Sequence, residues 1–168
     1  ILENSNVNID FLKKEIMTFL KKYAYSCDNI KIEEVIFNLL IKNNLTLSLA
    51  ESCTGGLISK SITDISGASN YFIGSLVAYS NEIKSNFLDI PNSTIEKYGA
   101  VSSEISELMA INISKKFKSD IALSCTGISG PNGGTDKKPV GTVYISIKFF
   151  DKILTEKFIF RLNRESHR

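Results

Sequence analysis

Residues 45–65 read LTLSLAESCTGGLISKSITDI, and this stretch changes character twice. In residues 45–50 apolar and polar side chains alternate along the chain, which predicts a strand, and residues 57–65 have apolar side chains at helical spacing. A glycine-containing turn over residues 51–56 joins the two. A strand that passes through such a turn directly into a helix points backbone N–H groups at an anion. The stretch therefore predicts an α/β unit with a ligand-binding loop.

The flanking segments supply the other expected elements. Apolar patterning predicts helices over residues 10–23, 32–42, 81–89 and 101–117, and strands over residues 70–80, 120–126, 141–150 and 152–160. This order mixes parallel crossovers with antiparallel neighbours. We predict an α/β domain whose mixed parallel and antiparallel sheet has helices on its faces, in three layers.

The domain organisation expected from this pattern has two parts. Residues 1–31 resemble a short helical N-terminal connector, or the end of an upstream domain, and residues 32–168 form the functional domain. The chain starts at Ile1 without a signal peptide, so we expect residues upstream of it.

Composition excludes several classes of protein. The 168 residues are 43% hydrophobic, enough for a real core, and carry 20 Lys and Arg against 18 Asp and Glu. This near balance gives no electrostatic reason to expect nucleic acid or a membrane as a partner. The three cysteines, Cys27, Cys53 and Cys125, form no C-x-x-C pair. We therefore expect a reducing, cytoplasmic location and no metal site.

The only histidine is His167, next to the end of the chain, which argues against a central histidine base. Ser52 lies where a strand yields to a helix, so amides from Cys53 to Gly56 could hold an oxyanion near its hydroxyl. Two alternatives stay open: Ser52 is only an N-cap residue, or Cys53 is the nucleophile instead.

The candidate bases for Ser52 are Tyr79 and Lys84, which follow the predicted strand over residues 70–80. For a lysine to act as a base, its pKa must lie about 3 pH units below the ordinary value. This requires about 4 kcal/mol of desolvation or of repulsion by nearby positive charge. Taken alone, Lys84 is more simply a surface lysine in a lysine-rich chain. The residues themselves therefore leave its role open.

Two further features point to ligand contact. A second glycine loop, over residues 127–134, begins after the strand that ends at Thr126. Ligands of α/β sheets bind beyond the carboxyl ends of strands. All three arginines lie in the last eight residues, at Arg161, Arg164 and Arg168. An arginine in a lysine-rich chain marks either a bidentate phosphate or carboxylate contact, or a solvated terminus.

Six motifs, in this order, resemble the C-terminal domain of competence-damage-inducible (CinA) proteins, which includes nicotinamide-nucleotide amidases. The resemblance covers residues 32–168 and has two departures. The family often has Gly-Asp where this chain has Leu162-Asn163, and it continues into a C-terminal helix, which we expect beyond Arg168. The motifs are AESCTGG (50–56), YSNEIK (79–84), YGAVS (98–102), TGISGP (126–131), GG (133–134) and KPVGTV (138–143).

The resemblance implies hydrolysis of the carboxamide of nicotinamide mononucleotide, through an acyl-enzyme and without metal or cofactor. It implies that Ser52 is the nucleophile, that Lys84 is its partner and that Tyr79 assists. It also implies a homodimer. The alternative is a non-catalytic nucleotide-binding or assembly module of a longer protein. The residues expected to bind the nucleotide substrate are Cys53, Thr54, Gly55, Gly56, Thr126, Gly127 and Arg164, the last through the phosphate.

Overall fold

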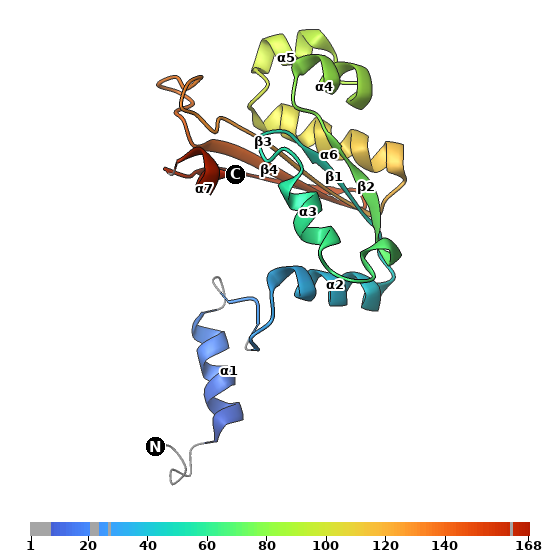
Figure 1. Cartoon of the computed structure of the whole chain (residues 1–168), viewed down its shortest axis with the longest axis vertical. Helices are drawn as coiled ribbons and strands as arrows, with labels where there is room; N and C mark the ends of the chain where they lie inside the picture. Colours follow the sequence, from blue (N-terminus) through green and yellow to red (C-terminus); the bar gives the residue numbers. More distant parts are fainter. Residues whose placement is uncertain (1–7, 21–23, 27, 162) are drawn as a thin grey trace.

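The computed structural model describes residues 8–20, 24–26, 28–161 and 163–168. Its centre is a five-stranded sheet in the order β2-β1-β3-β4-β5 (Figure 1). Strands β2, β1 and β3 are parallel, whereas β4 and β5 are antiparallel additions. The mixed sheet predicted from the sequence is therefore confirmed. The strands are β1 (Leu47–Glu51), β2 (Phe72–Val77), β3 (Ile121–Gly127), β4 (Thr142–Phe149) and β5 (Lys152–Ile159).

Helices cover both faces of the sheet (Figure 1). On one face α6 (Ser103–Phe117) packs across β1, β3 and β4, with α4 (Asn81–Leu88) and α5 (Asn92–Tyr98) beside it. Its side chains Ile105, Met109 and Ile113 are almost fully buried. Each such side chain contributes about 1.5–3 kcal/mol relative to an exposed one. This helix therefore anchors the face that carries α4.

The other face has its own core. Helix α2 (Ile32–Asn43) and helix α3 (Leu57–Thr63) bring Leu40 and Ile62 against Leu47 and Leu49 of β1 and the buried ring of Tyr71. The sheet thus has two hydrophobic cores, and the three-layer arrangement is confirmed. Part of this face remains open as an apolar groove of about 460 Å³ between α2, α3 and strands β3 and β4.

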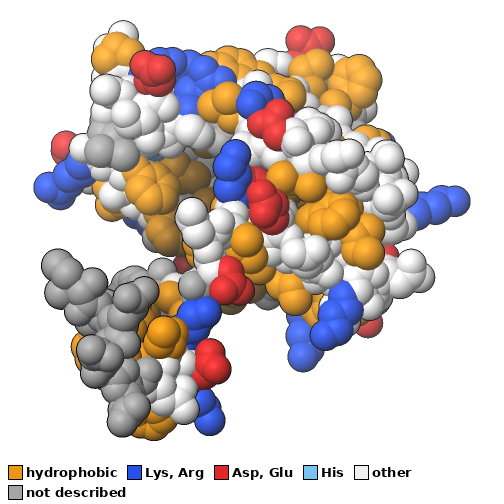
Figure 2. Space-filling view, turned by 60° about the horizontal axis from the view of Figure 1, so that its bottom comes forward, with side chains coloured by type: hydrophobic (Ala, Val, Ile, Leu, Met, Phe, Trp, Pro, Cys, Tyr) orange, Lys and Arg blue, Asp and Glu red, His pale blue; other side chains and the backbone are white. Residues whose placement is uncertain are grey.

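The first helix lies apart from this domain. Helix α1 (Ile9–Phe19) buries none of its residues, and Figure 2 shows it standing away from the main body. Its apolar side chains at Phe11, Ile16 and Phe19 are all more than half exposed. A helix was predicted over residues 10–23. The observed helix begins one residue earlier, at Ile9, and ends at Phe19. Residues 21–23 lie outside the described part of the chain.

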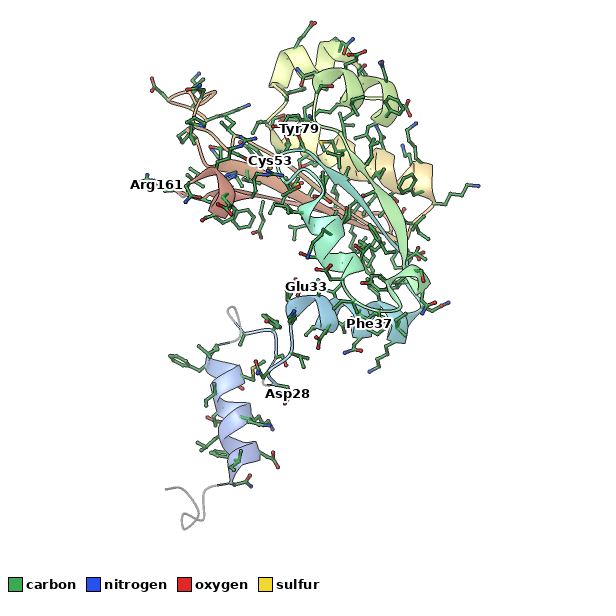
Figure 3. All side chains as sticks on the ribbon, viewed as in Figure 1. Asp28, Glu33, Phe37, Cys53, Tyr79 and Arg161 are labelled. Atoms are coloured by element: carbon green, nitrogen blue, oxygen red, sulfur yellow. The ribbon has the colours of Figure 1, made fainter. Side chains whose placement is uncertain are left out.

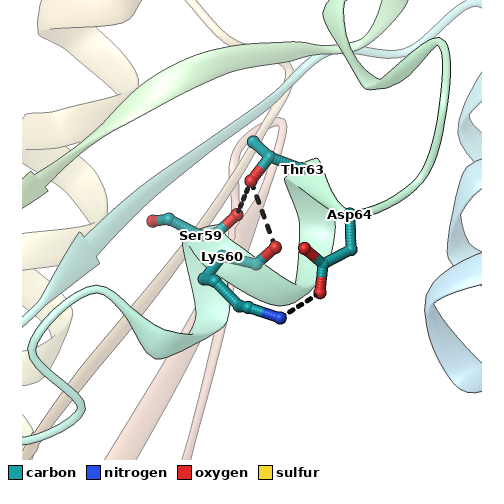
Figure 4. A network of polar contacts seen from close by, with 4 residues as sticks. All are labelled: Ser59, Lys60, Thr63 and Asp64. Carbon is teal, nitrogen blue, oxygen red and sulfur yellow. Dashed lines mark hydrogen bonds and ion pairs between the residues drawn. The ribbon is translucent and has the colours of Figure 1, made fainter.

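Helix α3 illustrates how the exposed surface of this layer is built. Thr63 Oγ1 donates to the carbonyls of Ser59 and Lys60, and Lys60 pairs with Asp64 one turn away (Figure 4). Exposed pairs of this kind contribute about 0.3–0.5 kcal/mol in a helix. The network therefore supports the helix end only slightly, and its stability comes from the buried side.

The region after β1 differs in two respects from what the sequence predicted. The strand predicted over 70–80 is shorter, because residues Ala68–Asn70 form a 3₁₀ turn and the chain leaves the sheet after Val77. Helix α5 was not predicted from the sequence. Pro91 precedes its first helical residue with φ −58°, a value already suited to a helix start.

Candidate active site

The strand register brings the two glycine loops to the same edge of the sheet. Glu51, the last residue of β1, pairs with Cys125 of β3 and with Val77 of β2. Beyond the strand end, the amide of Ser52 donates to the carbonyl of Cys125 at 3.1 Å. The loop after β1, the loop after β3 and the segment after β2 therefore converge at the carboxyl ends of parallel strands.

Ser52 lies at the beginning of the loop between β1 and α3 and is only 7% exposed. The loop turns through Gly55 and Gly56, whose φ angles of 59° and 95° favour glycine. The N-cap of α3 is Gly56 and not Ser52. The alternative reading of Ser52 as a helix cap is therefore wrong.

Hydrogen bonds to the side chain of Glu51 fix the position of this loop. Its buried carboxylate accepts hydrogen bonds from Thr54 Oγ1 at 2.7 Å, from the amides of Gly56 and Ile58 at 3.0 and 3.1 Å, and from the amide and hydroxyl of Ser59. Burial alone would raise the pKa of Glu51, but the hydrogen bonds from Ser59 and Thr54 outweigh it and hold the pKa below its ordinary value. Glu51 is thus an ionised anchor for the α3 N-terminus.

Lys84 reaches Ser52 from helix α4. Its Nζ donates to Ser52 Oγ at 3.1 Å, to the carbonyl of Ala78 at 2.7 Å and to the carbonyl of Tyr79 at 3.3 Å. The side chain is only 1% exposed and lacks a carboxylate partner in the ion pairs of the described residues. Burial lowers the pKa of Lys84 to about 8, although a thiolate at Cys53 or Cys125 would act in the opposite direction.

Tyr79 contributes to the site in two separate ways. Its backbone carbonyl contacts Lys84, whereas its side chain is 60% exposed. The phenol oxygen accepts a hydrogen bond from Nη2 of Arg164 at 3.0 Å, and Nη1 of the same arginine donates to the carbonyl of Gly130 at 2.8 Å. Arg164, the first residue of helix α7 (Arg164–His167), therefore ties the second glycine loop to the segment after β2.

The second glycine loop begins with two closely packed residues. Thr126 is buried and its Oγ1 donates to the carbonyl of Ala100 at 2.8 Å. A Cβ on Gly127 would lie 2.9 Å from the carbonyl oxygen of Thr142 and 3.1 Å from Cys53 Sγ. A larger residue at position 127 would therefore crowd both β4 at Thr142 and the side chain of Cys53.

The loop amides divide into two groups. The amide of Gly55 donates to the carbonyl of Ser52 at 3.1 Å, and that of Gly56 is held by Glu51. Among the hydrogen bonds of the described residues, the amides of Cys53 and Thr54 have no oxygen acceptor. Of the four backbone amides expected to hold an oxyanion, only those of Cys53 and Thr54 therefore remain available.

Cys53 and Cys125 form a buried cluster with Val143 behind Ser52. The interaction with Cys125 and burial raise the pKa of the Cys53 thiol, whereas the interaction with Cys53 lowers the pKa of Cys125. A raised pKa leaves little thiolate at Cys53 near neutral pH. This argues against Cys53 as the nucleophile.

The C-terminal residues cover a pocket of about 420 Å³ behind the loop, lined in part by Cys53, Cys125 and His167. His167 is buried, and neither ring nitrogen has a hydrogen-bond partner among the described residues. Arg168 donates from Nη2 to the carbonyl of Thr54 at 2.9 Å. Figure 3 places Cys53 and Tyr79 at the same end of the sheet, near α7, with Arg161 on its outer side.

The site thus brings together three segments: the loop with Ser52, the segment with Tyr79 and Lys84, and helix α7 with Arg164. Sequence reasoning did not assign Glu51 or Cys125 to it. The signal for Glu51 was a carboxylate at the end of an apolar strand, directly before a helix start that lacks a side-chain cap. Across the described ranges, no group of three or more His, Cys, Asp or Glu side chains could hold a metal ion, and no helix is long and apolar enough to cross a membrane.

Comparison with known proteins agrees with this architecture. The family described as the CinA C-terminal domain matches residues 29–168. A competence-damage inducible protein of Thermoanaerobacter pseudethanolicus is 46% identical over 160 residues, covering 95% of this chain and 39% of the relative. A CinA-like protein of Dictyoglomus thermophilum is 50% identical over 145 residues, covering 86% of this chain and 35% of the relative. The chain therefore spans less than half the length of these relatives.

Solved structures show the same fold. A competence/damage inducible protein of Agrobacterium tumefaciens aligns with a TM-score of 0.78 at 32% identity, covering 80% of this chain and 83% of that one. A CinA superfamily protein of Escherichia coli aligns with a TM-score of 0.79 at 27% identity, covering 88% and 87%. The chain belongs to the CinA C-terminal domain family, as the motifs indicated.

Proposed function

We propose that this CinA C-terminal domain hydrolyses the carboxamide of nicotinamide mononucleotide to nicotinic acid mononucleotide and ammonia. The proposal rests above all on one contact, the 3.1 Å hydrogen bond between Lys84 Nζ and Ser52 Oγ. Both side chains are buried, and the pKa of Lys84 is lowered to about 8. A lysine of that pKa is partly neutral near pH 7.5 and accepts a proton from a serine.

Acyl transfer would follow from this pair. Neutral Lys84 takes the Ser52 hydroxyl proton as Oγ bonds to the carboxamide carbon, and the amides of Cys53 and Thr54 stabilise the oxyanion. Lys84 then gives its proton to the leaving nitrogen, so the C–N bond breaks and ammonia departs. Water, deprotonated by Lys84, attacks the acyl-serine ester, and Ser52 recovers its proton as the acid is released.

Arg164 supports the choice of a nucleotide as substrate. Its guanidinium is exposed and donates to the Tyr79 hydroxyl and the Gly130 carbonyl. Arginine presents a planar set of donors that matches a phosphate group. We propose that the 5′-phosphate exchanges with one of these contacts, so that the pyridine ring extends inward to Ser52.

A substrate panel tests the proposal. Purified protein is given nicotinamide mononucleotide, nicotinamide riboside or free nicotinamide, and ammonia and the acid product are quantified together. We expect the mononucleotide to be the best substrate and to yield equal amounts of both products. Binding of the mononucleotide without ammonia release, measured by calorimetry on the same sample, would instead favour the non-catalytic nucleotide-binding or assembly module.

A further inference from the structure

A pair of thiols lies directly behind the Ser52 loop and takes no part in the proposed chemistry. Cys53 follows Ser52 in the chain, and Cys125 is the β3 residue whose carbonyl binds the Ser52 amide at 3.1 Å. Both side chains belong to one buried cluster with Val143 and interact with each other. Cys125 lies in β3 and Cys53 in the loop that follows β1, and both are free thiols, so they are placed to form a disulfide on oxidation.

We propose that Cys53 and Cys125 are a peroxide-sensitive dithiol whose oxidation to a disulfide switches off the adjacent site. The loss of activity rests on the proposed function, whereas formation of the disulfide does not. Cys53 follows Glu51, the register partner of Cys125, by two residues, and its side chain packs with Cys125 and Val143 in one buried cluster. A disulfide needs Cα atoms about 4.4–6.8 Å apart, so the bond requires the loop at Cys53 to close on β3.

The surroundings of Cys125 favour the first step. Thr54 Oγ1 lies 3.1 Å from Cys125 Sγ, and the neighbouring Cys53 holds the pKa of Cys125 below its ordinary value. A lowered pKa increases the share of thiolate, which is the form that reacts with peroxide. Both sulfurs line the pocket of about 420 Å³ under α7, and Cys53 remains 7% exposed. Hydrogen peroxide is hardly larger than water and can enter through this pocket.

The reaction balances with hydrogen peroxide as the oxidant. The Cys125 thiolate attacks one peroxide oxygen, the O–O bond breaks, and sulfenic acid and hydroxide form. The Cys53 thiol then attacks the Cys125 sulfur and expels the hydroxyl group, which leaves as water with the Cys53 proton. The hydroxide recovers the proton that Cys125 had released. Two thiols and one peroxide thus yield one disulfide and two waters, and two electrons pass from sulfur to oxygen.

The disulfide would disturb the proposed nucleophile for a geometric reason. Two sulfurs in van der Waals or hydrogen-bonded contact must close to about 2.05 Å. Cys53 is the residue that moves most easily, because Cys125 is fixed within β3 while Cys53 lies in the loop. A displacement of about 1 Å next to a reacting group is enough to cost about 100-fold in rate.

The thiol state is measured first, on the full chain with Cys27→Ser so that only two cysteines remain. After hydrogen peroxide treatment, the protein is unfolded, alkylated and weighed by mass spectrometry. We expect a species lighter by two hydrogens that takes up no alkylating reagent until it is reduced. Two alkylated cysteines after treatment, or oxidation confined to one sulfur as sulfinic acid, would overturn the proposal.

The activity is measured on the same samples. We expect ammonia release to fall at least tenfold on oxidation and to return with dithiothreitol. The matched variants Cys125→Ser and Cys125→Ala should form no disulfide and should keep their own initial activity at the same peroxide dose. Full activity of a protein shown to contain the disulfide would refute the switch. A protein inactive before oxidation would instead refute the amidase, while the thiol measurement would still decide whether the disulfide forms.

Discussion

The protonation of Lys84 should make the stability of this protein depend on pH in a predictable way. The ordinary pKa of 10.5 is lowered to about 8 by burial. At about 1.4 kcal/mol per pH unit, this gap corresponds to about 3 kcal/mol. Below pH 8 the lysine is charged in both the folded and unfolded states, so the cost of burying the charge is present in full. Above pH 8 the folded protein releases the proton first.

The sign follows from proton binding. Between pH 8 and 10.5 the unfolded chain holds more protons than the folded one, so the free energy of unfolding rises with pH. In Lys84→Met, which keeps a long side chain but does not titrate, this rise is absent. The difference in unfolding free energy between wild type and Lys84→Met should therefore grow in favour of wild type by about 2.5 kcal/mol between pH 7 and pH 10.

Urea unfolding followed by circular dichroism at pH 7, 8, 9 and 10 measures this difference, and the chain has no tryptophan to follow by fluorescence. The matched control is Lys42→Met, which replaces an exposed lysine in α2. Its difference from wild type measures the pH dependence that a lysine-to-methionine replacement produces at an exposed position. If Lys84→Met shows no larger pH dependence than this control, Lys84 has an ordinary pKa, and the proposed base would lose its physical support.

Three further predictions concern activity and loop stability. With neutral Lys84 as the base, kcat/KM should rise about tenfold per pH unit below about 8 and level off above it, so a profile flat from pH 6 to 9 would count against a lysine base. Arg164→Lys should raise KM for nicotinamide mononucleotide at least about tenfold with little change for the riboside, and equal losses on both would exclude a phosphate contact. Glu51→Gln should lower the unfolding free energy at pH 7 by about 2 kcal/mol, as judged by thermal unfolding, and less at pH 4. Because the pKa of Glu51 is lowered in the folded state, its contribution is present above about pH 4.5 and is lost as pH falls, so an equal loss at both pH values would contradict an ionised anchor.

The parts of the fold that were predictable from sequence are those set by local pattern. The strand, glycine turn and helix around Ser52 were expected because alternation, positive-φ glycines and helical spacing all lie within about twenty residues. The helix that became α6 was expected from its apolar patterning, and its start is capped by Ser102, whose Oγ accepts from the amide of Ile105 at 3.3 Å. Helix α5 was missed because Pro91 begins a helix as readily as it ends one.

The site was only partly predictable because its contacts join distant segments. Ser52 and Lys84 are 32 residues apart and meet only because α4 folds back after β2. Their proximity followed from a resemblance to a family and not from the local sequence, in which Lys84 is one lysine among many. The anchoring by Glu51 and the pairing of Cys53 with Cys125 depend on strand register, which no local pattern specifies.

The central claim, that Ser52 is the nucleophile of an amidase, is tested most directly by ammonia release from nicotinamide mononucleotide by Ser52→Ala and Cys53→Ala side by side. Both positions lie in the same loop, so each variant shows how far a replacement that only disturbs this loop lowers the activity. The account predicts that Ser52→Ala loses at least about a thousandfold in kcat while Cys53→Ala keeps measurable turnover. Turnover by Ser52→Ala near the wild-type level, with Cys53→Ala inactive, would contradict the account and would identify the Cys53 thiol as the nucleophile.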